Sequence, residues 1–350
     1  MAESRTFKTN LQVSSSPHLV TSLDTRKTMM YVLIALIPSA VAATVYFGAG
    51  ALLRIILGAF FAFASEWCYN KIMKKPDTTH DLSCLVTGVI LAMNVPANFP
   101  VWMLAIGCGV AIVIVKCLYG GIGRNIANPA IVGRIVLLLS WTSYMTTWPL
   151  TTFQKTADAV TGATPLGMLA DKAYDQFPSL GNMFIGNIGG ALGETCTIAI
   201  ILGGLFLIWK KIISPIIPCA FIATVFVIAL VYYAVNPIDG YNAFHMALFH
   251  ILGGGVFFGA FFCATDYVTS PIMSRGKLIY GIGCGIVTMV IRLMCSYPEG
   301  VSFAILFMNI MTPLIDRYVE RQFYGIAAAE KAAKKAAKEA AAAGAKEAAK

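Results

Sequence analysis

Ten long apolar runs constrain this chain more than any other feature of its sequence. They are 16 to 22 residues long and are separated by polar or glycine- and proline-containing breaks. A helix needs about 20 apolar residues to cross the hydrocarbon core of a bilayer, which is about 30 Å thick. We therefore predict ten membrane-spanning helices, at residues 28–47, 51–70, 82–97, 101–118, 126–144, 188–209, 213–234, 244–264, 278–296 and 301–316.

The composition excludes a water-soluble domain and a disordered chain. Hydrophobic residues make up 58% of the 350 residues and charged residues only 12%, which is more apolar material than one soluble core can bury. Disordered chains are instead rich in charges and poor in aromatic residues. The expected fold class is all-α, a polytopic membrane protein. The polar residues before the first run lack the apolar core of a signal peptide, so we expect no cleaved leader.

The lysines and arginines predict the orientation in the membrane, because basic residues are retained on the cytoplasmic side. With the N-terminus inside, sixteen of the twenty that precede the tail fall on the inner side, Lys116 and Arg134 among them, whereas Lys155 and Lys172 fall in an outward loop. Both termini are therefore predicted to be cytoplasmic. This placement accounts for the net charge of +9, so the lipid bilayer is the expected surrounding and no nucleic acid is expected as a partner.

The longest connection divides the chain into two halves. We predict a cytoplasmic N-terminal segment at 1–27, a first five-helix half at 28–144, an outward loop at 145–187, a second five-helix half at 188–316 and a cytoplasmic Ala- and Lys-rich tail at 317–350. Halves joined in this way run in opposite directions through the membrane, as in an inverted repeat. The tail is predicted to be a solvated helix. An alternative is that its lysines contact anionic lipid or an acidic partner.

The outward loop contains the segment Asp158-Ala-Val-Thr-Gly-Ala-Thr-Pro-Leu166. Gly162 and Ala163 leave its backbone uncrowded. Pro165 favours an extended conformation for Thr164, which projects the threonine hydroxyl outward. On composition alone, this segment is an ordinary surface turn.

The same segment resembles the flavinylation signature D-x-x-T-G-A-T, at which a flavin transferase joins FMN through its phosphate to the last threonine. The matching residues here are Asp158, Thr161, Gly162, Ala163, Thr164, Pro165 and Leu166. Other stretches between about residues 15 and 325 are similar to the NqrB/RnfD family of membrane subunits. These stretches are Ser15–His18, Tyr119–Ala130, Phe261–Pro271, Tyr297–Gly300 and Asn309–Asp316.

The resemblance implies an electron-transfer subunit of a ferredoxin:NAD oxidoreductase (Rnf) complex in a bacterial cell membrane. Such a subunit carries FMN on Thr164, outside the membrane. It couples electron flow to Na⁺ or H⁺ translocation and works with flavoprotein and iron-sulfur subunits, so it is not catalytic alone. A quinone-linked NqrB-like subunit is the alternative within the family, but it has a longer N-terminal extension. A secondary transporter or channel would also have opposed halves and interrupted helices, and an assembly scaffold without a cofactor remains a third alternative.

A second flavin near the inner face, such as non-covalent riboflavin, is also implied by the resemblance. Its candidate contacts are Asn125, Asn128, Thr265, Asp266, Thr269 and Ser270. The nearby glycines do not form a G-x-G-x-x-G fingerprint, because Ile126 stands at the third glycine position. The alternative is structural, with glycines that allow close helix approach and Asn125 and Asn128 that satisfy an interrupted backbone.

Four charged residues are candidates at membrane depth, where an uncompensated charge is costly and therefore a functional candidate. They are Arg54, Glu66, Glu194 and Arg292. We expect Glu194 to lie on a proton or ion path. For Glu66 we expect the side chain to extend to the inner interface near Lys71, and a place on the ion path is the alternative.

The cysteines and histidines predict no metal site in this chain. The nine cysteines lie in or beside apolar runs and form no C-x-x-C pair, so this chain alone is not expected to hold an iron-sulfur cluster. One thiolate offered to a partner's cluster is left open. The four histidines are scattered along the sequence.

Overall fold

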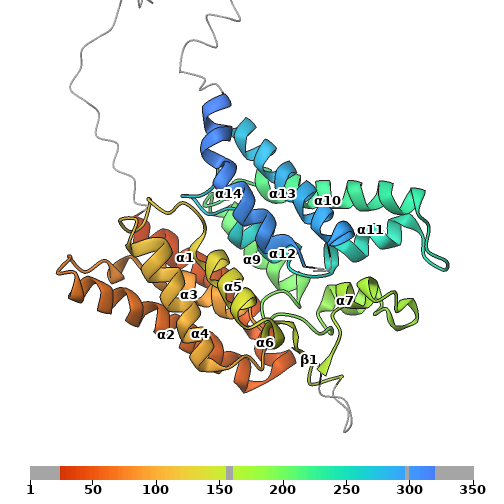
Figure 1. Ribbon diagram of the computed structural model, residues 1–350, viewed down its shortest axis with the longest axis horizontal. Helices are drawn as coiled ribbons and strands as arrows, with labels where there is room; N and C mark the ends of the chain where they lie inside the picture. Colours follow the sequence, from red (N-terminus) through yellow and green to blue (C-terminus); the bar gives the residue numbers. More distant parts are fainter. Residues whose placement is uncertain (1–23, 155–160, 296–298, 320–350) are drawn as a thin grey trace, which may run out of the picture.

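The computed structural model describes residues 24–154, 161–295 and 299–319, which fold almost entirely into helices (Figure 1). Each of the ten predicted apolar runs contains a helical segment. The expectation of an all-α chain needs one small addition, because two strands of two residues each pair in the long connection. Residues 1–23 of the predicted N-terminal segment, residues 320–350 of the predicted tail, Asp158 and part of the Tyr297–Gly300 stretch lie outside the described residues.

The first group of helices occupies the red-to-yellow part of Figure 1. Asp24 caps the first of them, because its side chain accepts a hydrogen bond from the N–H of Thr25. Gly48, at φ 83°, makes the sharp connection between the first two. In order, the elements are α1 (Thr25–Phe47), α2 (Ala49–Ile72), η1 (Thr79–Asp81), α3 (Ser83–Met93), α4 (Val101–Gly109), the π-helical η2 (Val110–Cys117), α5 (Pro129–Ser140) and α6 (Thr142–Thr146).

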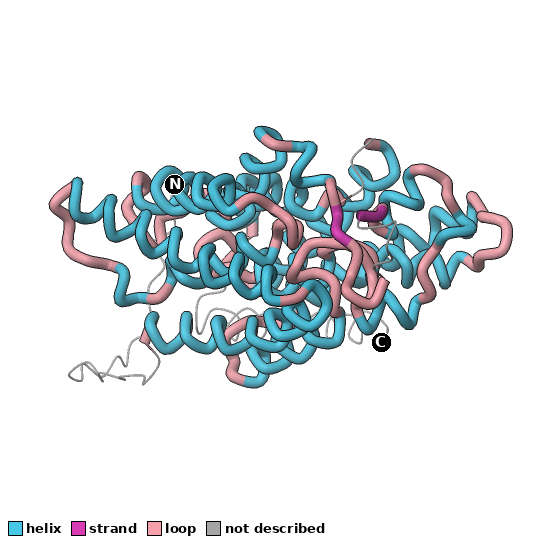
Figure 2. Tube along the Cα trace, turned by 90° about the horizontal axis from the view of Figure 1, so that it is seen from below, coloured by secondary structure: helices cyan, strands magenta, loops and turns pink. Residues whose placement is uncertain are grey.

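The long connection is ordered into short elements. Strand β1 (Trp148–Pro149) pairs antiparallel with β2 (Thr161–Gly162), so that Trp148 faces Gly162. Figure 2 shows these strands against the surrounding helices. Next come α7 (Pro165–Ala170), η3 (Tyr174–Gln176) and α8 (Leu180–Ile185). The connection is hydrogen-bonded to the end of α1, because the N–H and the hydroxyl of Thr152 both donate to the carbonyl of Tyr46.

The second group of helices follows in the green-to-blue part of Figure 1. The predicted run 188–209 is only partly helical, since its helix begins at Thr197. The glycine-rich stretch before it, residues 186–196, is irregular and largely buried. The elements are α9 (Thr197–Trp209), α10 (Ile216–Val235), α11 (Ala243–Leu252), α12 (Val256–Phe258), the π-helical η4 (Gly259–Cys263), α13 (Ser274–Met294) and α14 (Val301–Tyr318).

Among the described helices, α1, α2, α10 and α13 are each long and apolar enough to cross a membrane. A fifth crossing is formed if α11 is joined to α12 and η4, which bend by 59° at Gly253–Gly255. Large apolar side chains cover the outer surface of these helices; Val45 and Ile56, for example, are each 56% exposed. Such a surface is stable against lipid and unfavourable against water. The chain is therefore a multi-pass membrane protein.

The two groups share a packing pattern. In the first group, α2 packs against α3 and against α4–η2, and α5 packs against η2. In the second group, α10 packs against α11 and α13, and α14 packs against α13. Contacts between α1 and α9 and between α5 and α14 join the groups. At the first junction the backbones are very close, because a Cβ on Gly203 would lie 2.1 Å from the carbonyl oxygen of Ala35.

Candidate functional sites

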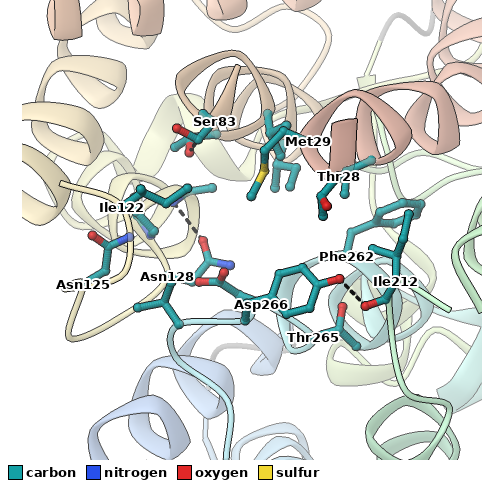
Figure 3. Close-up of a pocket in the computed structure, with 18 of the residues that line it drawn as sticks. Thr28, Met29, Ser83, Ile122, Asn125, Asn128, Ile212, Phe262, Thr265 and Asp266 are labelled. Atoms are coloured by element: carbon teal, nitrogen blue, oxygen red, sulfur yellow. Dashed lines mark hydrogen bonds between the residues drawn. The ribbon is translucent and has the colours of Figure 1, made fainter. Parts of the chain in front are cut away.

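A cavity of about 590 Å³ opens where the two groups of helices meet, near the N-terminal end of α1. Thr28 and Met29 of α1 and Ser83 of α3 lie on one side of it, and Phe262 and Thr265 of the second group lie across from them (Figure 3). The lining is mostly apolar, with a few polar groups among the apolar side chains. This volume and this lining are typical of sites that bind small organic molecules.

Four of the six residues predicted to contact a second flavin line this cavity, namely Asn125, Asn128, Thr265 and Asp266. The side chain of Asn128 is occupied by the fold. Its amide oxygen accepts from the N–H of Ala130 at 3.0 Å, and its amide nitrogen donates to the carbonyl of Cys263 at 3.0 Å. Asn128 thus satisfies the interrupted backbone ahead of α5, which was the structural alternative for this residue.

Asn125 has an available hydrogen-bonding group. Its amide oxygen is buried and has no partner among the described residues. A buried amide oxygen of this kind costs about 1–3 kcal/mol if nothing bonds to it. Asn125 therefore fits the role of a contact for a bound polar ring better than Asn128 does.

The other two predicted contacts, Thr269 and Ser270, do not line the cavity. They are buried in the turn that follows η4, where the hydroxyl of Thr269 donates to the carboxylate of Asp266 at 3.1 Å. The carbonyl of Thr269 accepts from Thr312 of α14 at 2.9 Å. Both positions therefore shape the turn that presents Thr265 and Asp266.

The charges at the cavity are mainly acidic. Asp24 and Asp266 both line it, and burial raises the pKa of Asp266 despite opposing hydrogen bonds from Thr269, Val268 and Tyr267. Lys116 also borders the cavity, but its ammonium group lies 2.5 Å from a carboxylate oxygen of Glu66. The sequence did not indicate Lys116 as a lining residue, because its polarity suggested an exposed loop.

Glu66 forms a buried ion pair, and so the expectation that it extends to the interface near Lys71 is wrong. The side chains of Glu66 and Lys116 are 1% and 3% exposed. Glu66 also accepts from the hydroxyl of Thr78 at 2.7 Å, and Lys116 donates to the hydroxyl of Ser83 at 2.8 Å. Two charges buried together cost far less than either one alone, which explains why both are tolerated inside the first group.

Arg134, which was counted among the basic residues of the inner side, is also buried. Arg134 lies within α5, is 3% exposed, and pairs with Glu299 just ahead of α14. It donates further to the hydroxyl of Ser302 at 2.8 Å. Lys116 and Arg134 are thus buried within helices, although both satisfy the positive-inside count.

The flavinylation-like segment lies beside the end of α1 opposite to the cavity. Thr161 and Gly162 form β2, and Thr161 and Ala163 are exposed. Thr164 has the predicted extended backbone, at φ −70° and ψ 159°. Its hydroxyl oxygen accepts from the N–H of Gly167 at 3.1 Å and caps α7.

Thr164 itself is only 7% exposed, so the expected outward projection of its hydroxyl is wrong in this conformation. Because capping hydrogen bonds contribute about 0.5–2 kcal/mol, turning the hydroxyl outward has a modest cost. Pro165 and Leu166 are buried below it, and Asp158 lies outside the described residues. A modified Thr164 would therefore direct its attached group toward the exposed side of Thr161 and Ala163.

Beneath Thr164 is a small cleft that Glu194 and Thr195 also line. Its volume of about 10 Å³ admits one water-sized sphere. An isoalloxazine ring does not fit there, which again directs a group attached to Thr164 to the exposed side. Glu194, one of the predicted ion-path residues, is thus placed next to the motif, whereas Glu66 is paired with Lys116, which lines the larger cavity.

Comparison with known proteins gives the family. The model of the NQR2, RnfD, RnfE family matches residues 12–325. The D subunit of the Na⁺-translocating ferredoxin:NAD⁺ oxidoreductase complex of Acetobacterium woodii is 42% identical over 326 residues, which cover 93% of this chain and 98% of that protein.

Two further relatives have similar coverage. The D subunit of the proton-translocating ferredoxin:NAD⁺ oxidoreductase complex of Clostridium ljungdahlii is 41% identical over 333 residues, covering 93% of this chain and 99% of that protein. The D subunit of an ion-translocating oxidoreductase complex of Ectopseudomonas mendocina is 36% identical, covering 89% and 95%. The match extends over both groups of helices and the connection between them, and the chain belongs to the NQR2, RnfD, RnfE family.

Proposed function

We propose that this chain is the membrane electron-transfer subunit of a ferredoxin:NAD⁺ oxidoreductase complex that couples electron flow to Na⁺ or H⁺ translocation. The observation that carries the proposal is the near full-length match to the D subunits of such complexes. The electron-donating and electron-accepting ends of the reaction would lie on flavoprotein and iron-sulfur partner subunits. The relatives named for sodium and for protons are almost equally similar to this chain, so overall identity favours neither coupling ion.

The finer topology of the proposal is ten crossings, in two halves of opposite orientation, with both termini in the cytoplasm of a bacterial cell. The shared packing pattern of the two helix groups supports it. So does the position of the two candidate sites at opposite ends of α1. That helix has 23 residues and spans about 35 Å, which is long enough to separate the two sites across a bilayer.

Thr164 is the proposed attachment point for FMN, on the outer side. Its support is the TGAT segment, the extended backbone of Thr164 and the exposed neighbours Thr161 and Ala163. A covalent link keeps a redox group at an exposed loop, where the protein supplies position and electrostatics while the flavin supplies the electron chemistry. Maturation would require a flavin transferase that reaches the same side of the membrane.

The inner cavity is the proposed site of a second, non-covalent flavin. Its volume of about 590 Å³ and its apolar walls fit a flavin ring, and the oxygen of Asn125 provides a buried acceptor. Asp24 and Asp266 line the cavity, while Lys116 already has Glu66 as its partner. Because carboxylates repel a phosphate, this charge distribution favours riboflavin over FMN.

The attachment is tested by flavin fluorescence of the denatured polypeptide in a gel, together with the intact mass of the chain. The wild-type chain should fluoresce and carry the mass of one FMN less one water, and Thr164→Ala should remove both signals. Thr146→Ala, which changes an exposed threonine in the same connection, is the matched control and should keep both. A dark wild-type chain from a host that contains the transferase would point instead to a transporter or a scaffold.

The second site is tested with Thr164→Ala protein, which leaves only non-covalent flavin. Riboflavin should bind to this protein, and its fluorescence should be quenched on binding. FMN should bind more weakly. Replacing Asn125 by Leu should weaken riboflavin binding, whereas the same change at Asn236, which is exposed and does not line the cavity, should not. Equal affinity for FMN and riboflavin would contradict the charge argument.

A further inference from the structure

Three interruptions of helical structure meet at the cleft beneath Thr164. The first is the C-terminal end of α3, and the second is the irregular stretch ahead of α9. They are joined by hydrogen bonds from the N–H groups of Leu192 and Gly193 to the carbonyls of Val95 and Met93, at 3.2 and 2.7 Å. The third is the glycine break between α11 and α12. Irregular backbone at membrane depth is tolerated only where protein or a polar cavity covers it.

Two oxygens that line this cleft are buried and have no partner among the described residues. They are Oε2 of Glu194 and Oγ1 of Thr195. The two residues are 6% and 1% exposed. The other carboxylate oxygen of Glu194 accepts from the N–H of Ala191 at 2.9 Å, which fixes the orientation of the group. Buried polar groups are almost always satisfied, so these two oxygens of adjacent residues indicate a ligand in or beside the cleft.

The size of the cleft restricts this ligand. At about 10 Å³ it holds one water-sized particle. Glycines keep the space around the carboxylate open, since a Cβ on Gly255 would lie 2.8 Å from Oε2 of Glu194, and a Cβ on Gly190 would lie 3.3 Å from Oε1. A hydrated divalent ion, which keeps several waters, is too large.

The charges around the cleft balance before a ligand enters. Glu299 also lines the cleft and forms an ion pair with Arg134. Arg292 lies behind Gly254 and is not a lining residue; its guanidinium donates to the carbonyls of His250 and Gly253, at 2.5 and 3.0 Å. These two arginines match the two glutamates. A ligand that adds one positive charge is therefore compensated when Thr164 carries a negatively charged phosphodiester.

We infer that Glu194 and Thr195 form a binding site for one dehydrated Na⁺ ion, directly beneath the attachment point proposed at Thr164. Carboxylate and hydroxyl oxygens are hard ligands that suit this ion, and unwound segments near the interface of two opposed halves are the usual setting for it. The inference rests on the proposed function, because it identifies the site at which the transported ion binds close to the outer redox group.

The test measures retention of radioactive sodium by the full-length chain in lipid nanodiscs, with choline chloride replacing sodium chloride at equal ionic strength. The wild-type chain should bind one Na⁺ saturably. Glu194→Gln and Thr195→Val should each raise the dissociation constant about tenfold or more. Two controls should leave it unchanged: Asp175→Asn, which changes an exposed acid in η3, and Ser39→Ala, which removes another buried hydroxyl that has no partner among the described residues.

Sodium-dependent thermal stabilisation is the second readout, because a ligand that binds only the folded chain raises the unfolding temperature. The wild-type chain should be stabilised by Na⁺ relative to choline, and the two cleft variants should not, even where they are less stable in choline. No saturable binding by a wild-type chain that carries the flavin, or binding unchanged in both variants, would overturn the site. Flavin fluorescence of the same preparation is read in parallel, so its loss counts against the proposed function and not against the site.

Discussion

Lys116 is the most unusual single residue of the first group of helices. It lies in the π-helical segment η2 and is almost fully buried, yet it carries a charge whose partner, Glu66, lies 50 residues earlier in α2. π-Helical segments occur frequently at functional sites, and this one brings the lysine to the edge of the inner cavity. Lys116 therefore forms part of one wall of the proposed flavin site.

Replacing Lys116 by Met should destabilise the chain by about 3–5 kcal/mol, because the carboxylate of Glu66 is then left buried without its cation. The double variant Lys116→Met/Glu66→Gln should recover most of this loss. Lys71→Met is the control, since Lys71 is exposed near the end of α2 and should change stability by less than about 0.5 kcal/mol. Unfolding in denaturant, in mixed micelles, measures all three; equal losses in the single and double variants would contradict the ion-pair explanation.

Asp266 should make stability depend on pH. Its pKa in the folded chain is raised by burial, so the fold favours the protonated acid. The corresponding stability is present below the unfolded value of about 3.9 and is lost as pH rises through the folded pKa. Asp266→Asn cannot titrate, and its melting temperature should therefore exceed that of the wild type increasingly from pH 4 upward. If the melting temperatures of the two proteins change with pH in the same way over this range, Asp266 is not the cause of the pH dependence.

Residue identity alone did not predict these buried charges. Lys116 and Arg134 were counted only as basic residues of the inner side, and their partners lie 50 and 165 residues away in the sequence, so the two ion pairs were not predicted. Four of the six residues predicted to contact a second flavin line one cavity, because the resemblance identified the two segments of the chain that meet there. Attachment of FMN to Thr164 remains a prediction, and the burial of this threonine was not visible in the sequence, because it depends on the cap of α7.

At the scale of elements, the glycines decide where helices approach each other. Gly58 of α2 faces Gly88 of α3, and a Cβ added to Gly88 would lie 2.4 Å from the carbonyl oxygen of Gly58. Small residues allow such close backbone contact in membranes, where packing rather than the hydrophobic effect drives association. The contact holds α3, and with it Ser83, in place above the inner cavity.

Gly88→Ala should therefore destabilise the chain by about 1–3 kcal/mol, because α2 and α3 must separate to accept the methyl group. Gly109→Ala is a matched control within an apolar helix: a Cβ at that position would meet none of the described residues within 4 Å, and alanine is favoured in helices. Thermal unfolding in nanodiscs compares them. Similar losses for both variants would mean that helix propensity or insertion, and not the contact, sets the effect.

Apolar run length predicted the positions of the helical segments well but could not predict their interruptions. The run 188–209 is apolar throughout most of its length, yet its first residues are irregular because Gly189, Gly190 and Gly193 provide little to pack in a helix. The bend between α11 and α12 has the same cause, in three consecutive glycines. Hydropathy averages over such breaks, and they are the places where the small outer cleft forms.

At the scale of the whole molecule, the two helix groups place one candidate site at each end of α1. The inner cavity lies among residues near Asp24, and the connection that carries Thr164 is fastened to Tyr46. Electrons and ions that pass between the two sides of the membrane would use the interface of these groups. The proposed sodium site lies at that interface, near the outer end.

The orientation predicts opposite accessibility of two surface positions. In a chain whose native cysteines are replaced, Ala163→Cys should react with a membrane-impermeant maleimide in intact cells, because Ala163 is exposed in the outward connection. Lys74→Cys, at the exposed end of α2, should react only after the membrane is permeabilised. The reverse pattern would place the TGAT segment in the cytoplasm and remove the basis for its flavinylation there.

The ion pair between Arg134 and Glu299 has a consequence for biosynthesis. The two residues are 165 positions apart in the sequence. Because ribosomes add about 5–20 residues per second, Glu299 is synthesised roughly ten to thirty seconds after Arg134. During that interval α5 is poorly suited to settle in lipid, and the translocation machinery or another protein has to shield it. The last helix to be made thus completes the insertion of the first half, and chains that stop before Glu299 should be degraded rather than accumulate as stable fragments.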